Sequence, residues 1–456
     1  MRSRHTDNLL YICFFLSGAS GLVFEVVWMR KLSLVFGSTV HAVSTVVAVF
    51  MGGLALGSWL FGKLADRGQK LLRLYVWIEA GIAASGAAIS LGLLPVLDTT
   101  YVFLHRLGLG SGIGLFLVRF FLSVAIMLGP TVLMGGTLPV VGRYLVRSRS
   151  ELGARLGSLY GLNTLGAVAG TLAAGFWLIM LYGETATCVV AAFCNLTAAA
   201  LALAVVASTG DTVSEETPDE DKKKQQPIYS DEKIAWVPWL FGVSGFAALA
   251  YEVLWTRALI YFVGLSVHAF TIILACFLVG IALGSLIATS IVDRWRNLFH
   301  LFGALQWVIA LSALASLPLI GQLNLIYQKL NLLLGANTWT QITLVKFCLC
   351  LAVLGLPTLA MGAAFPVVNR IFIRRRSALG RGVGALYAAN TAGTILGSLG
   401  AGFLLLPLFG ISGSLVAVAL INAALAAAAV RLETTTGRRS LAINISGAIL
   451  AAACGL

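Results

Sequence analysis

Twelve apolar stretches, each long enough to cross a lipid bilayer as a helix, follow one another along this 456-residue chain. A membrane-spanning helix needs about 20 mainly apolar residues, because the hydrocarbon core is about 30 Å thick. Hydrophobic residues make up 59% of the chain and charged residues only 11%, whereas soluble domains carry about 25% charged residues. The sequence therefore predicts an all-α polytopic membrane protein. The predicted spans are residues 9–30, 38–62, 74–97, 112–140, 157–181, 185–207, 235–257, 265–291, 299–320, 339–368, 384–409 and 411–430.

The positive charges predict which ends of these helices face the cytoplasm. The formal net charge is +13, and with twelve spans most of the Lys and Arg residues fall in loops on one side. Cytoplasmic loops retain Lys and Arg, so we interpret the charge as a topology signal and expect no nucleic-acid partner. The basic start MRSRHTDN leads into an apolar run without a cleavage signal. We therefore expect a multi-pass protein with an uncleaved first helix and a cytoplasmic N-terminus.

The two halves of the chain are copies of one another. SGASGLVFEVVWMR (17–30) returns as SGFAALAYEVLWTR (244–257), with seven of fourteen positions identical at an offset of 227 residues. The same offset, without a gap, aligns polar residues throughout both halves, which chance similarity between apolar segments would not do. The aligned pairs include Glu25 and Glu252, His41 and His268, Asp66 and Asp293, Arg67 and Arg294, Arg143 and Arg370, Tyr160 and Tyr387, and Asn163 and Asn390.

The duplication predicts the domain organisation. Residues 1–207 and 234–432 are two six-helix repeats, and an even number of spans per copy gives them the same orientation. Residues 208–233 are polar, carry acidic and basic blocks, and predict a cytoplasmic linker that cannot form a core. Residues 433–456 are a basic stretch and an apolar tail, which could begin a thirteenth span of a longer protein or form a short terminal amphipathic segment.

Several ionisable or amide side chains lie inside predicted spans. A charge at the bilayer centre costs at least about 2.5–3.5 kcal/mol, so such residues usually face a cavity or a partner. Two interpretations stay open. The residues could line a substrate or ion pathway, or they could form structural ion pairs, for example Glu25 with Arg119 and Glu252 with Lys346. The candidates are Glu25, Glu79, Arg119 and Asn163 in the first copy and Glu252, Gln306, Lys346 and Asn390 in the second.

Other polar motifs are candidates for narrower roles. His41 and His268 begin the second span of each copy and could be proton relays or interfacial residues. Asn163 and Asn390 could alternatively form hydrogen bonds between helices. The seven cysteines lack the spacing of a metal site, and we expect neither a metal nor a cofactor.

Six plus six helices is the arrangement of the major facilitator superfamily. The loop GKLADRGQK (62–70) resembles the loop after the second helix of that superfamily, and TSIVDRWRN (289–297) keeps Asp293-Arg294. SGASGLVFEVVWMR, VSTVVAVFMGGLALGSWLFGKLADR and GSLYGLNTLGAVAGTLAAGF resemble the membrane part of bacterial fused major-facilitator/spermidine-synthase proteins. This resemblance implies a bacterial inner (plasma) membrane and, in many members, an attached aminopropyltransferase-like domain.

The chain departs from that pattern because it contains no soluble α/β segment and no glycine-rich cofactor turn after a strand. We therefore do not expect it to catalyse aminopropyl transfer itself. Our main hypothesis is an alternating-access transporter in the lipid bilayer for a small charged metabolite, with polyamines implied by the resemblance. The alternative is a membrane platform for a spermidine-synthase-like domain or subunit outside this chain. A lipid-handling protein is a third hypothesis, and the sequence leaves the sign of the substrate's charge open.

Overall fold

The computed structural model describes residues 4–36, 40–68, 70–93, 99–103, 106, 112–211, 229–264, 267–335 and 337–433. Within these ranges the secondary structure is helical, without strands. The first sequence copy forms α1 (Arg4–Phe36), α2 (Val40–Arg67), α3 (Leu71–Ala88), α5 (Gly112–Leu145), α6 (Leu152–Ala173) and α7 (Ile179–Thr209). The second forms α10 (Val237–Val263), α11 (Val267–Thr289), α12 (Leu298–Leu334), α13 (Trp339–Phe372), α14 (Leu379–Gly400) and α15 (Leu406–Glu433).

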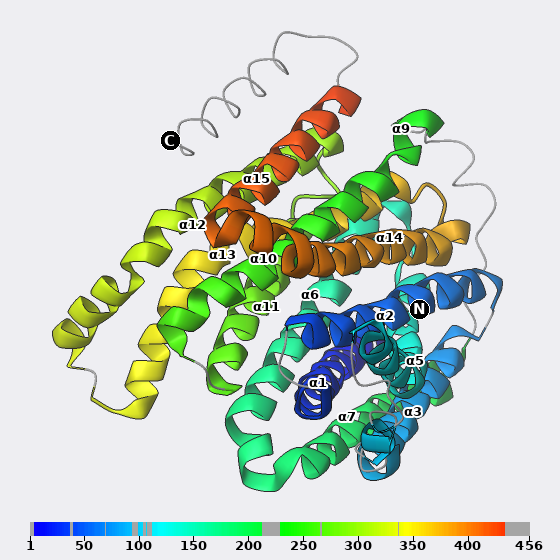
Figure 1. Cartoon of the computed structure of the whole chain (residues 1–456). Helices are drawn as coiled ribbons and strands as arrows, with labels where there is room; N and C mark the ends of the chain where they lie inside the picture. Colours follow the sequence, from blue (N-terminus) through cyan, green and yellow to red (C-terminus); the bar gives the residue numbers. More distant parts are fainter. Residues whose placement is uncertain are drawn as a thin grey trace.

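Ten helical segments of the described chain are long and apolar enough to cross a membrane. Two of them, Arg149–Thr209 and Arg376–Glu433, have 61 and 58 residues, three times the length that one crossing needs. Each contains a glycine with a positive φ, 77° at Gly183 and 64° at Gly410. Figure 1 shows the chain turning back near the start of α7, the part of the helix that contains Gly183. Counting the two arms of each segment separately gives the twelve helices named above and confirms the all-α polytopic fold.

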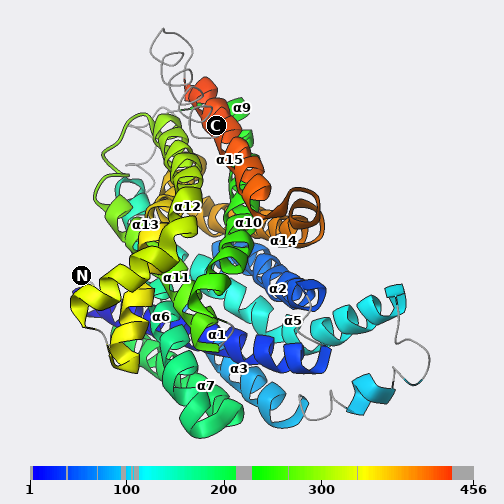
Figure 2. The same ribbon diagram turned by 60° about the vertical axis from the view of Figure 1, so that its left-hand side comes forward.

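Helix packing repeats the sequence duplication. Within the first copy α1 packs on α6 and α7, α2 on α5, and α3 on α5 and α7. The second copy has the equivalent contacts of α10 with α14 and α15, α11 with α13, and α12 with α13 and α15. Figures 1 and 2 show the two sets of helices on opposite sides of the molecule. Two further pairs, α2 with α14 and α6 with α11, join the copies.

Glycines let these helices approach until the backbones touch. A Cβ atom on Gly166 of α6 would lie 1.9 Å from the carbonyl oxygen of Phe15 in α1. The equivalent Gly393 of α14 would place it 1.7 Å from the carbonyl oxygen of Gly242 in α10. Small residues at crossings are how membrane helices gain close packing without a hydrophobic driving force. The glycine-rich faces are therefore packing surfaces in both copies.

The short polar helix α9 (Asp231–Ala235) precedes α10. Most of the predicted linker and the tail, residues 212–228 and 434–456, lie outside the described residues. The proposed linker and thirteenth span therefore stay predictions.

Candidate functional site

A cavity of about 280 Å³ lies between the helices of the two copies. Its wall comes from α1, α2, α5 and α6 of the first copy and from α10, α11, α13 and α14 of the second. These are four equivalent helices from each copy. The cavity therefore lies on the pseudo-symmetry axis that the 227-residue offset defines, where parallel-repeat transporters place their substrate site.

Two carboxyl groups face this cavity, one from each copy. Glu25 of α1 and Glu252 of α10, which the 227-residue offset relates, both line it. Of the ion pairs in the described part of the chain, none involves either glutamate. Both side chains are therefore available to a ligand in the cavity.

The intramembrane cations lie elsewhere. No Lys, Arg or His is among the described residues that line the cavity. Arg119 donates from Nη2 to the hydroxyl of Tyr101 at 3.4 Å. Lys346 donates from Nζ to the carbonyl oxygen of Val263 at 3.2 Å and lies 5.7 Å from the ring centre of Tyr327. The structure thus places neither cation beside Glu25 or Glu252, and the two hypothetical ion pairs are not formed.

Aromatic rings and neutral polar groups complete the wall. Tyr160 and its equivalent Tyr387 line the cavity, together with Phe241 and Phe365. The rings of Tyr160 and Phe365 stack across the copies, with their centroids 4.3 Å apart. The sequence aligned Tyr160 with Tyr387 but gave no reason to place them in the site. Hydroxyl and amide side chains are contributed by Ser17, Thr137, Asn163, Thr164, Ser244, Asn390, Thr391 and Thr394.

Asn163 and Asn390 line the cavity and also tie helices together. The Nδ2 of Asn163 donates to the carbonyl oxygen of Phe14 at 3.0 Å. Asn390 makes the same bond, also at 3.0 Å, to the carbonyl oxygen of Phe241. Each bond joins the fifth helix of its copy to the first, so the interhelical role considered for these residues is present in both copies.

Glu79 and Gln306 are buried behind the cavity, outside its lining. Asn195 donates from Nδ2 to Oε2 of Glu79 at 2.6 Å, and Asn422 donates in the same way to Oε1 of Gln306 at 2.6 Å. Gln306 itself donates from Nε2 to the hydroxyl of Ser244 at 3.1 Å. The partners Asn195 and Asn422 were missed from the sequence, although the 227-residue offset relates them.

His268 lies between aromatic rings from both copies. Its ring centroid is 5.2 Å from that of Phe176 and 5.5 Å from that of Trp339. It does not line the cavity. His41 is in the first turn of α2, but its side chain lies outside the described residues. The proton-relay role of both histidines stays a prediction.

The helices α5 and α13 each contain two prolines, and each helix continues through them without a break in the secondary structure. The segment between Pro130 and Pro139 supplies four lining residues, Met134, Gly135, Thr137 and Leu138. In α13, Met361 and Phe365 line the cavity between Pro357 and Pro366. The same proline-framed segment thus faces the site in both copies.

At one end of the bundle, two aspartates join the copies. We call this end the basic face; it is defined here by Asp66, Asp293, Arg143, Arg370 and Arg381. Asp66 at the end of α2 accepts from the backbone N–H groups of Gly380 and Arg381, at 2.8 and 2.9 Å. These N–H groups begin α14, where the helix dipole favours an anion. Asp66 is also 3.6 Å from Nε of Arg143.

Asp293 makes the equivalent contacts in the other direction. It accepts from the N–H groups of Gly153 and Ala154 at the start of α6, at 3.1 and 2.8 Å. Its Oδ1 is 3.1 Å from Nε of Arg370. Burial raises the pKa of the Asp293 carboxyl, although these contacts oppose the shift. The basic face therefore carries two related latches between the copies, whereas the predicted motif residues Arg67 and Arg294 are exposed.

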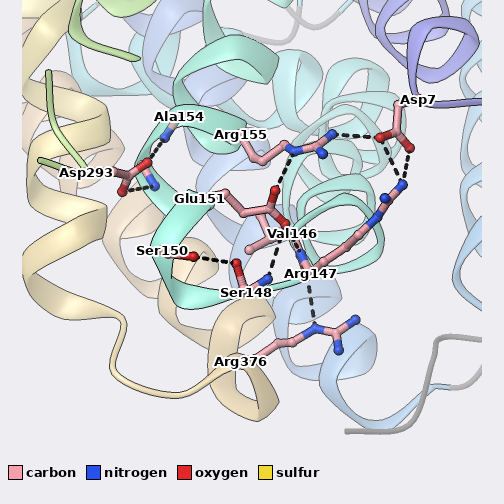
Figure 3. A network of polar contacts seen from close by, with 11 residues as sticks. Asp7, Val146, Arg147, Ser148, Ser150, Glu151, Ala154, Arg155, Asp293 and Arg376 are labelled. Carbon is pink, nitrogen blue, oxygen red and sulfur yellow. Dashed lines mark hydrogen bonds and ion pairs between the residues drawn. The ribbon is translucent and has the colours of Figure 1, made fainter. Parts of the chain in front are cut away.

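A further polar network reinforces the basic face on the side of the first copy (Figure 3). In the second copy Arg374, the equivalent of Arg147, contacts Asp231. Arg147 donates from Nη2 to both carboxylate oxygens of Asp7, at 2.8 and 2.9 Å. Arg155 contacts Asp7 at 2.8 Å and Glu151 at 3.2 Å. Arg376 of the second copy donates to the carbonyl oxygen of Val146 at 3.0 Å. The network holds the α5–α6 connection against the start of α1 and against the second copy.

Replacing Asp66 with Asn is expected to loosen the contact between α2 and α14. A hydrogen bond to a charged group contributes about 1.5–3 kcal/mol, and 1.4 kcal/mol is a tenfold change in an equilibrium. We expect the amides of Gly380 and Arg381 to exchange with deuterium roughly tenfold faster in the variant, measured by mass spectrometry.

The matched control is Asp211→Asn. Asp211 accepts from the N–H groups of Leu72 and Arg73 at 2.8 and 3.0 Å, at the start of α3 in its own copy. This variant should accelerate exchange at the start of α3 and leave α14 unchanged. Unchanged exchange at Gly380 in Asp66→Asn would contradict the latch.

Comparison with known proteins defines the fold. No protein-family description and no curated protein match the sequence. Among solved structures, a bacterial homologue of the iron transporter ferroportin in an outward-facing state is 18% identical, with a TM-score of 0.55 over 93% of this chain and 98% of that one. The human organic anion transporter MFSD10 (TETRAN) is 11% identical, with a TM-score of 0.61 over 95% and 100%. The Major Facilitator Superfamily transporter FucP in the outward conformation is 15% identical, with a TM-score of 0.58 over 94% and 98%.

These similarities cover nearly the whole chain and the whole of each compared protein. The chain therefore has the fold of the major facilitator superfamily, with two six-helix bundles around a central cavity. At these identities the likeness extends to the fold alone. The resemblance to the fused spermidine-synthase proteins stays a prediction.

Proposed function

We propose that the protein is an alternating-access transporter of small organic cations, with polyamines as the first class to test. One observation carries this proposal: the central cavity is lined by two carboxyl groups and, among its described lining residues, by no cationic side chain. A cationic side chain in the cavity, such as Arg119 or Lys346, would repel a polycation. Both make contacts outside the cavity, which favours a cationic over an anionic substrate.

The remaining wall is also suited to an amine. Aromatic faces attract ammonium groups, by about 0.5–1 kcal/mol at exposed sites and by about 2 kcal/mol when water is excluded. Tyr160, Tyr387 and Phe241 are available for this role. The hydroxyl and amide oxygens of the wall can accept the hydrogen bonds that each ammonium group donates. The two carboxyl groups come from opposite copies, so a substrate with two amino groups could contact both.

Alternating access would use the two contact surfaces between the copies. The latches close the basic face, and their release would let the bundles rock around the cavity. The Lys and Arg residues of this face favour a cytoplasmic location. The N-terminus starts α1 at the same face, where Asp7 joins the polar network.

Uptake by proteoliposomes tests the proposal. We expect saturable uptake of radiolabelled spermidine and no uptake of succinate, because a dicarboxylate would meet two acidic groups and no cation. Empty liposomes provide the background. Saturable succinate uptake without spermidine uptake would overturn the cation assignment. Uptake of neither would favour the membrane-platform hypothesis.

A further inference from the structure

A carboxyl group lies behind the cavity, and the transport site described above does not use it. Glu79 of α3 has no solvent exposure. Its partner is an amide, since Asn195 of α7 donates to Oε2 at 2.6 Å. The other carboxyl oxygen, Oε1, is buried and has no hydrogen-bond partner among the described residues.

The surroundings of Glu79 are neutral. The groups that face it are Ser17 and Cys13 of α1, Tyr75 of α3 and Asn195 of α7. The charged residues of α5, which also packs against α3, are engaged elsewhere. Arg119 contacts Tyr101 and Arg143 contacts Asp66. A carboxylate ion buried without a cation is costly, so the environment favours a bound proton on Glu79.

The second copy provides an internal comparison. Gln306 occupies the position of Glu79, with Ser244 and Asn422 in place of Ser17 and Asn195. Gln306 is likewise fully buried. An uncharged amide therefore satisfies this environment without an acid. Packing at this position therefore does not require a carboxyl group, and Glu79 gives the first copy an ionisable group that the second copy lacks here.

Ser17 connects this group to the cavity. Its side chain lines the cavity. Ser17 is also the equivalent of Ser244, whose hydroxyl accepts from Gln306 at 3.1 Å in the second copy, so it occupies the same place beside Glu79. A proton on Glu79 can therefore exchange with the cavity through one hydroxyl group, without crossing the apolar core. Glu25 and Glu252, by contrast, face the cavity directly.

We propose that Glu79 is a proton-binding site, separate from the two substrate carboxyl groups, through which protons are coupled to transport. The proton site stands on the geometry alone, whereas its coupling to transport rests on the proposed function. Loss of the proton would leave a buried anion, which is tolerated when water reaches Ser17 from an open cavity and disfavoured when the cavity closes. Proton binding would thereby accompany the conformational change.

The proton is tested without substrate, by infrared difference spectroscopy of the purified protein titrated from acidic to alkaline pH. We expect a protonated-carboxyl C=O band in the wild type that is lost in Glu79→Gln. The matched variant Gln306→Glu should gain a second such band. In Asn195→Ala the Glu79 band should remain but shift in frequency, because the hydrogen bond to Oε2 is removed. Because Asn195→Ala retains Glu79, its band shift still assigns the band to Glu79 if Glu79→Gln folds poorly.

The coupling is tested by spermidine uptake with and without a proton gradient. In Glu79→Gln we expect the proton gradient no longer to stimulate uptake, so that the rate with a gradient equals the rate without one. An unchanged infrared spectrum in both Glu79→Gln and Asn195→Ala would overturn the proton site. A lost band together with full gradient stimulation would overturn the coupling. If the wild type transports no spermidine, the infrared result still decides the proton site, so the two failures are distinguishable.

Discussion

The double variant Glu25→Gln/Glu252→Gln is expected to bind spermidine roughly 10²–10⁴-fold more weakly than the wild type. Each carboxylate is expected to make a charge-assisted hydrogen bond with an ammonium group, and such a bond contributes about 1.5–3 kcal/mol. Two of them contribute about 3–6 kcal/mol, and every 1.4 kcal/mol is a tenfold change in Kd. Each single variant should lose about half of this free energy.

The affinity is measured by isothermal titration calorimetry in detergent, with the thermal unfolding of each variant followed in parallel. Glutamine has nearly the size of glutamate, and neither carboxylate is in an ion pair within the described chain, so we expect the fold to persist. The matched control is Glu184→Gln. Glu184 lies outside the cavity, paired with Arg30 at 2.9 Å and Lys31 at 3.1 Å, and its loss should leave spermidine affinity unchanged. A double variant that binds as the wild type does would refute the carboxylate site.

Much of the architecture follows from hydropathy and from the single offset of 227 residues. Apolar length predicts the spans, and the offset predicts which helices are equivalent, because copies of one sequence pack in the same way. The pairs α1 with α6 and α10 with α14 illustrate this. The sequence pattern does not predict which helices of one copy contact the other. The helix pairs α2–α14 and α6–α11 pack together, but no sequence signal relates their residues.

The site was predicted only in part. The offset and the cost of buried charge selected Glu25 and Glu252 as a pair of candidates, and both line one cavity. Arg119 and Lys346 looked equivalent to them because all four lie in apolar spans. However, α5 has 34 residues, about 51 Å of helix, which is longer than a bilayer core. Arg119 lies fifteen residues before Met134 of the cavity wall, about 22 Å along the axis. Hydropathy identifies a membrane-spanning segment, but it does not show how far along the helix a residue lies from the cavity.

The latches illustrate a second limit. The Asp-Arg motif singled out Asp66 and Arg67 together, but the two residues do not pair with each other: Asp66 contacts backbone N–H groups and Arg67 is exposed. The partners are the N–H groups of Gly380 and Arg381, more than 300 residues away in the chain. Backbone donors carry no sequence signature of their own, so only the assembled helices reveal them.

Replacing Gly393 with Leu is expected to destabilise the protein by about 3 kcal/mol or more, and to lower the yield of folded protein accordingly. Overpacking costs about 1–3 kcal/mol where neighbours can adjust, and occasionally more. Here the Cβ would lie 1.7 Å from the backbone oxygen of Gly242 and 3.0 Å from the backbone nitrogen of Phe246. Backbone atoms inside a helix cannot rotate away as a side chain can. The variant would therefore force α14 and α10 apart and disturb Asn390, whose amide bonds α10 at Phe241.

Thermal unfolding in detergent and the monodisperse fraction on size-exclusion chromatography measure this effect. Gly321→Leu in α12 is the matched control, because nothing lies within 4 Å of a Cβ at that helical position. It should unfold close to the wild-type temperature, since leucine favours helix more than glycine does. The equivalent Gly166→Leu should behave as Gly393→Leu does, because its Cβ would meet the backbone of Phe15. If both crossing variants were as stable as Gly321→Leu, the first and fifth helices of each copy could not be in backbone contact, and the wall that carries Glu25 and Glu252 would have to be built differently.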